Sequence, residues 1–129
     1  MADYQRSGMV RTVTAISLLA GIWAIIAPYS FAGGLGAEWN GWIFGVLVIL
    51  CSFGAMMAPL MRGYDVANLI WGVWLILSGW ALGEVGAGLR WNNVITGLVV
   101  IGCAWLALRY GAMLATMPEA SAGPTRRAA

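Results

Sequence analysis

Four runs of about 20 mostly apolar residues constrain the fold of this chain more than any other feature. They lie near residues 12–32, 41–61, 67–83 and 93–114. A helix of about 20 apolar residues crosses the roughly 30 Å hydrocarbon core of a bilayer. The 129 residues are 61% hydrophobic and only 9% charged, which is far from the balance of a soluble domain. We therefore expect an all-α integral membrane protein, a four-helix bundle embedded in the lipid bilayer.

The sequence also matches itself, which indicates an internal duplication. One set of equivalent residues has an offset of 51, and it aligns Gly21, Trp23, Pro28 and Tyr29 with Gly72, Trp74, Gly79 and Trp80. A second set has an offset of 52, and it aligns Trp39, Asn40, Gly45 and Cys51 with Trp91, Asn92, Gly97 and Cys103. A single inserted residue in the second copy explains the change of offset. The sequence thus predicts two tandem hairpins of two spans each, at about 12–61 and 67–114.

Two tandem hairpins enter the membrane from the same side, so they are expected to be parallel in orientation and related by a pseudo-two-fold axis along the membrane normal. Arginines flank one side of the predicted spans, at Arg6, Arg11, Arg62, Arg109, Arg126 and Arg127. The other side has only Arg90. The positive-inside rule therefore predicts that both termini are cytoplasmic. Residues 1–115 are expected to form the transmembrane domain, and the small, polar residues 116–129 a flexible cytoplasmic tail.

Two motifs recur in equivalent places of the predicted repeats. The first is Ala27-Pro28-Tyr29 in one copy and Ser78-Gly79-Trp80 in the other, and the second is Trp39-Asn40 and Trp91-Asn92. The combined pattern, G-x-W-x-I-x-[SA]-[PG]-[WY] followed by W-N-x-x-x-x-G, resembles the SPW repeat of small bacterial integral membrane proteins, named for a Ser-Pro-Trp motif. The resemblance covers roughly residues 17–54 and 68–107, although neither copy has the complete triplet. It implies an architecture of paired spanning helices and no particular activity.

The first motif is typical of a helix exit at the membrane surface. Proline and glycine bend or end a span, and the Ser78 hydroxyl is expected to bond back to the carbonyl of Trp74. The aromatic ring that follows, Tyr29 or Trp80, is expected at headgroup depth. A ligand role for the same residues stays open.

The second motif is typical of a helix entry. Asn40 and Asn92 are good N-caps for the second and fourth spans, and Trp39 and Trp91 mark the interface again. Glu38 and Arg90 precede the two tryptophans at equivalent positions. A symmetric bundle allows these opposite charges to approach each other, although an exposed pair adds only about 0 to 1 kcal/mol.

Small or polar residues spaced four apart recur in both copies, and such spacing lets helix backbones approach closely in a membrane. The matched positions are Ser17 and Gly21 with Asn68 and Gly72, and Gly41 and Gly45 with Asn93 and Gly97. We interpret them as helix-packing surfaces. From the sequence, they serve either to pack the four helices or to bind a helix of another subunit.

Four tryptophans fall inside the predicted spans, at Trp23, Trp71, Trp74 and Trp105. Large rings opposite small residues fill a bundle by shape, and packing is the favoured interpretation. The alternative is that they line a site for a quinone, pigment or lipid chain. Cys51 and Cys103 are interpreted as apolar fillers rather than a disulfide or metal pair, and we expect no cofactor and no metal site.

The reactive groups of an enzyme are scarce in this sequence. No carboxylate, His or Lys lies securely within a span, and no nucleophile has an evident base. Arg109, the charge closest to the bilayer interior, reaches the surface by snorkelling. A formal net charge of +2 is too small to suggest a nucleic-acid partner. We therefore predict no catalytic residues, no enzymatic activity and no ion pump.

Two functions remain. The favoured one is a structural or accessory subunit of a larger membrane complex or of a homo-oligomer, since the chain is small and rich in helix-packing positions. The alternative is a binding or transport module for an apolar small molecule such as a lipid, quinone or pigment. Seven arginines without any lysine, together with many Ala and Gly, suggest a GC-rich bacterial genome. The predicted location is thus the bacterial cytoplasmic (inner) membrane.

Overall fold

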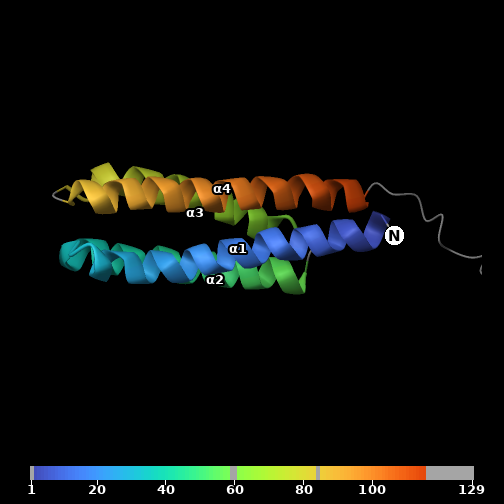
Figure 1. Cartoon of the computed structure of the whole chain (residues 1–129). Helices are drawn as coiled ribbons and strands as arrows, with labels where there is room; N and C mark the ends of the chain where they lie inside the picture. The colour runs from blue at the N-terminus through green and yellow to red at the C-terminus, as the bar shows by residue number, and fades with distance from the viewer. Residues whose placement is uncertain (1, 59–60, 84, 116–129) are drawn as a thin grey trace, which may run out of the picture.

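The residues that the computed structural model describes form four α-helices (Figure 1). They are α1 (Ala2–Ser30), α2 (Gly34–Met57), α3 (Gly63–Ala81) and α4 (Ala87–Ala115). The structure describes residues 2–58, 61–83 and 85–115. No strand occurs in these ranges, and the all-α prediction is confirmed. The tail predicted at 116–129 lies outside the described residues.

The helices form two antiparallel hairpins, α1 with α2 and α3 with α4, that lie side by side (Figure 1). α1 also packs on α4, and α2 packs on α3, so that the four helices surround a shared core. α1 begins and α4 ends at one end of the bundle, which we call the terminal end. α1 passes into α2, and α3 into α4, at the opposite end, which we call the loop end.

One residue from each helix meets at the centre of the bundle. Ala24, Val48, Leu75 and Val100 form a buried apolar cluster there. Leu75 is the repeat equivalent of Ala24, and Val100 is the equivalent of Val48, by the same offsets that align the motifs. The centre is therefore built from matching positions of the two predicted repeats, with the small Ala24 complementing the larger Leu75.

Glycines bring the two helices of each hairpin into backbone contact. A Cβ added at Gly45 would lie 2.8 Å from the carbonyl oxygen of Gly21, and one added at Gly97 would lie 2.6 Å from that of Gly72. All eight predicted helix-packing residues are buried: Ser17, Gly21, Gly41, Gly45, Asn68, Gly72, Asn93 and Gly97. These positions are thus occupied by contacts within the chain itself.

Three of the described helices have the length and hydropathy to cross a membrane, at Gly8–Ser30, Gly34–Met57 and Ala87–Met113. α3, with 19 residues, is long enough but falls short in mean hydropathy because it carries polar residues. Those residues, Asp65, Asn68 and Ser78, are buried against the other helices. Its outward face is apolar, at Val66, Ile70, Val73 and Leu77. Polar groups in a membrane bundle normally face its interior, so the low mean hydropathy of α3 is compatible with the spanning role predicted for it.

The helices begin before the apolar runs from which they were predicted. α2 begins at Gly34 and α4 at Ala87, more than a turn before the predicted starts at 41 and 93. α2 ends at Met57 rather than 61. Hydropathy marks the segment that lipid surrounds, whereas a helix continues wherever its backbone hydrogen bonds are maintained. The early starts change the roles of residues at the loop end.

Candidate functional site

The two recurring triplets adopt the same arrangement at the loop end. Ala27 and Pro28 are buried and Tyr29 is exposed, while Ser78 and Gly79 are buried and Trp80 is exposed. The ring therefore points outward in both copies, and the two residues before it face the bundle. A ring in this orientation at the end of a span suits the headgroup region.

Each triplet lies directly before a helix end, since α1 ends at Ser30 and α3 at Ala81. α1 continues past Pro28 to Ser30, and the chain then turns, with the amide of Gly33 donating to the carbonyl oxygen of Pro28 at 2.8 Å. Proline near the end of a helix removes only its own donor and leaves its carbonyl available. Ala32 has a φ of 49° and Gly34 a φ of 74°, and these left-handed conformations complete the reversal.

The predicted bond from Ser78 to Trp74 is wrong. The Ser78 hydroxyl donates instead to the carbonyl of Leu75, three residues earlier, at 2.7 Å. In this position its oxygen also accepts a hydrogen bond from Nδ2 of Asn93 on α4, at 3.3 Å. Because Asn93 lies on another helix, the local sequence does not indicate which carbonyl accepts the hydrogen bond of the Ser78 hydroxyl.

The predicted N-cap role of Asn40 and Asn92 is also wrong. Gly33 is the N-cap of α2 and makes no side-chain cap bond, and α4 begins at Ala87. Both asparagines therefore lie more than one turn inside their helices, where the first-turn amides that a cap serves are out of reach. Their side chains face the other hairpin instead.

Each asparagine accepts an indole hydrogen bond from the opposite hairpin. Trp23 Nε1 on α1 donates to Asn92 Oδ1 on α4 at 2.8 Å. Trp74 Nε1 on α3 donates to Asn40 Oδ1 on α2, also at 2.8 Å. Trp74 is the repeat equivalent of Trp23, and Asn92 that of Asn40. The tryptophan of each predicted repeat is thus bonded to the asparagine of the other, and these two bonds join the hairpins.

Further polar groups meet in the interior. Asn68 Nδ2 on α3 donates to Ser52 Oγ on α2 at 3.1 Å. Four buried polar atoms have no hydrogen-bond partner within the described part of the chain: Ser17 Oγ, Asn68 Oδ1, Trp71 Nε1 and Asn92 Nδ2. An unpaired buried polar group normally costs about 1 to 3 kcal/mol. The interior polarity is therefore only partly offset by hydrogen bonds.

Asp65 is a buried carboxylic acid that the sequence interpretation did not single out. It lies in the first turn of α3 at the terminal end, ahead of the apolar stretch that begins at residue 67, and is 7% exposed. Removal from water disfavours its charged form, and this burial raises the pKa of Asp65 from 3.8 to about 6. The signal available in the sequence was the spacing of Asp65 and Asn68, which places two polar residues on one face of a helix.

The four deep tryptophans do not surround one cavity. Trp71 and Trp74 pack on Phe44, with ring centroids 5.7 and 5.3 Å from that of Phe44. Trp105 lies on the outer surface of α4 and is 58% exposed. Trp23 lines an open groove of about 330 Å³ between α1 and α4, together with Ile16, Leu19, Ala20, Asn92, Ile95, Thr96 and Val99.

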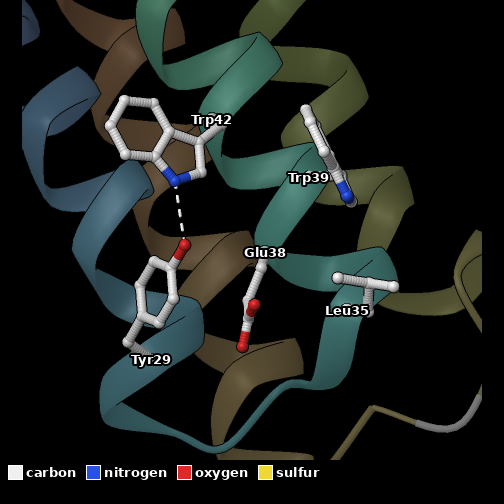
Figure 2. A pocket seen from close by; sticks show the side chains of 5 residues that line it. All are labelled: Tyr29, Leu35, Glu38, Trp39 and Trp42. Atoms are coloured by element: carbon white, nitrogen blue, oxygen red, sulfur yellow. Dashed lines mark hydrogen bonds between the residues drawn. The ribbon is translucent and has the colours of Figure 1, made fainter.

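A second hollow lies at the loop end, where α1 ends and α2 begins (Figure 2). Its volume is about 270 Å³, and it is lined by Tyr29, Leu35, Glu38, Trp39 and Trp42. Trp42 Nε1 donates to the Tyr29 hydroxyl at 2.9 Å. Sequence reasoning missed Trp42, although its position three residues after Trp39 places the two rings on neighbouring positions of a helix.

Cys51 and Cys103 are free thiols in the structure. Cys103 is buried and Cys51 is half-buried. Within the residues that the structure describes, no group of three or more His, Cys, Asp or Glu side chains is placed to hold a metal ion.

The apolar helices, the inward polar groups and the outward rings define a helical membrane protein. The chain matches the family model of the SPW repeat domain over residues 11–107 and belongs to that family. No curated protein and no solved structure matches the chain.

Proposed function

We propose that this membrane protein is a non-catalytic accessory subunit that docks, through its lipid-facing surface, on a larger membrane complex or on further copies of itself. The observation that carries the proposal is the use of the polar side chains at depth. They bond across the helices of the bundle, as in the bonds of Trp23 with Asn92 and Trp74 with Asn40. These polar side chains thus serve assembly of the unit, and the outer surface carries exposed apolar side chains on all four helices.

The outer face of α4 is the most suitable docking surface. Gly102 lies in the middle of this helix, and a Cβ added there meets no atom within 4 Å. The glycines at positions 21, 45, 72 and 97 have close neighbours within the chain, whereas Gly102 has none. It forms a notch between the exposed side chains of Leu98, Trp105 and Leu106. A helix of another chain gains close backbone contact at such a notch.

A photo-crosslinking residue at Leu106 is expected to capture one protein species in stoichiometric yield, and Gly102→Leu is expected to reduce that yield about tenfold because the added side chain fills the notch. Val46 on α2 is the matched control position, since the exposed fractions of Leu106 and Val46 are 40% and 37%. Mass spectrometry of the crosslinked product distinguishes a second copy of this chain from another protein.

The groove between α1 and α4 supports the second candidate function, binding or transport of an apolar molecule. If the protein is isolated as a monomer that carries a defined lipid, quinone or pigment, and Leu106 gives no more crosslinking than Val46, the accessory role is wrong.

We also propose that the terminal end is cytoplasmic, in a bacterial inner membrane, and that a pseudo-two-fold axis along the membrane normal relates the two hairpins. The exchanged Trp–Asn bonds support the axis. Arg11, Arg62 and Arg109 are exposed near the terminal end, and this supports the orientation by the positive-inside rule.

In a variant without native cysteines, Arg62→Cys is expected to react with a membrane-impermeant thiol reagent only after cells are opened. Gly86→Cys, at the loop end, is expected to react in intact cells with a permeable outer membrane. The opposite pattern would reverse the orientation, and reaction of both sites from one side would contradict the spanning arrangement.

A further inference from the structure

The second hairpin carries its own cation on an aromatic ring at the loop end. The guanidinium carbon of Arg90 lies 5.8 Å from the centroid of the Trp80 ring. Arg90 Nε also donates to the carbonyl oxygen of Gly79 at 2.9 Å. A cation at this distance from an indole face is attracted by the ring. The outward ring of the second triplet is therefore partnered within the chain.

The first hairpin has a carboxylate where the second has this cation. Tyr29 is the repeat equivalent of Trp80, and Glu38 is the equivalent of Arg90. The ion pair between Glu38 and Arg90 that symmetry allows is not formed, since Arg90 lies against Trp80, and Glu38 makes no ion pair with any residue that the structure describes. The equivalent place in the first hairpin is the hollow of about 270 Å³ described above.

Five side chains of mixed chemistry line this hollow. Figure 2 shows the Glu38 side chain between the Tyr29–Trp42 pair on one side and Trp39 on the other. The hydrogen bond from Trp42 to Tyr29 holds these two rings together. Leu35 completes the lining with an apolar surface. The hollow thus combines one carboxylate, three aromatic rings and an alkyl group, all near the end of a span.

We propose that this pocket binds an alkylammonium group. The carboxylate supplies the opposite charge, aromatic faces attract substituted ammonium ions, and Leu35 suits the carbon substituents. A bare divalent ion is a poorer fit, because Ca²⁺ takes six to eight oxygen ligands and the pocket has one carboxylate. Two sources present this chemistry at the membrane surface: a free amine and the ammonium headgroup of a lipid. The proposal is independent of whether α4 docks a partner.

The first test is an NMR titration of the full chain in a maltoside detergent, which itself has no ammonium group. Tetramethylammonium chloride is the probe, and sodium chloride at equal ionic strength is the reference. We expect saturable shifts of the Trp39 and Trp42 indole N–H signals, and about tenfold weaker binding in Glu38→Gln. Glu38→Arg is expected to abolish binding, because it places a cation in the chain as Arg90 does in the second hairpin.

Tryptophan variants provide a matched control. Trp39 and Trp91 are repeat equivalents with exposed fractions of 62% and 61%. Trp39→Leu is expected to weaken the titration followed at Trp42, whereas Trp91→Leu leaves it unchanged. Equal losses in both variants would overturn the proposal. Wild-type affinity in Glu38→Gln and Glu38→Arg, with circular dichroism melts that show both variants to be folded, would overturn it as well.

A second arm identifies the source of the group. Native mass spectrometry compares the protein released from phosphatidylglycerol nanodiscs with and without phosphatidylethanolamine. Retention of one phosphatidylethanolamine by the wild type, and its loss in Glu38→Gln, assigns the pocket to a lipid headgroup. Binding of tetramethylammonium without lipid retention assigns it to a free amine. Absence of both overturns the inference.

Discussion

Gly97→Ala is expected to destabilise the protein by about 2 to 3 kcal/mol, the upper part of the range of about 1 to 3 kcal/mol that is typical of overpacking in a close-packed interior. The added methyl would lie 2.6 Å from the Gly72 carbonyl oxygen and 2.7 Å from Cγ1 of Ile76. A side-chain atom can move aside, but the carbonyl belongs to the backbone of α3, so the helices themselves must separate. Unfolding in a mixed micelle with increasing denaturing detergent, followed by tryptophan fluorescence, measures the loss.

Gly102→Ala is the matched control on the same helix. Its methyl meets no atom within 4 Å, and alanine has the higher helix propensity by up to about 1 kcal/mol. We expect the control to be neutral or slightly stabilised. Gly45→Ala, in the first hairpin, is expected to behave like Gly97→Ala, because its methyl would lie 2.8 Å from the Gly21 carbonyl oxygen. Equal stability of the Gly97 and Gly102 variants would show that the glycine contact between α3 and α4 is not formed.

The second large effect concerns Asp65 and pH. Its pKa is about 6 in the folded chain against 3.8 ordinarily, because burial disfavours the charged form. Between these values the unfolded chain loses the proton that the folded chain retains. Stability should therefore fall as the pH rises from about 4 to about 6, and level off above that window. The shift corresponds to at most about 3 kcal/mol, and the helix N-terminus, which favours a negative charge, reduces it by up to about 1 kcal/mol.

Asp65→Asn removes this titration while keeping the shape of the side chain. We expect the variant to be more stable than the wild type by about 2 kcal/mol at pH 7, and to match it at pH 4. Denaturing-detergent unfolding at a series of pH values measures how the stability of the wild type and of the variant depends on pH. A variant that retained the wild-type pH dependence between 4 and 6 would show that another group is responsible.

The membrane character, the all-α class and the family follow from the sequence because they depend on signals carried along the chain. A run of about 20 apolar residues crosses a bilayer whatever its neighbours are. The fixed offsets between Gly21 and Gly72, and between Trp39 and Trp91, are visible without any structure. The burial of the small residues follows the same pattern in both copies, but whether a glycine such as Gly45 meets a helix of its own chain was left open.

The roles of individual polar residues were decided by the tertiary structure alone. Asn40 resembles an N-cap in isolation, yet its partner is Trp74 on the other hairpin. Ser78 bonds to the Leu75 carbonyl while it accepts from Asn93 of α4. Glu38 lines a pocket to which Tyr29, near the end of the neighbouring helix, contributes its ring. The physical reason is common to these cases. In a bundle, the partner of a polar side chain lies on a helix that is remote in sequence, so periodicity predicts which face is buried but not which atoms meet there.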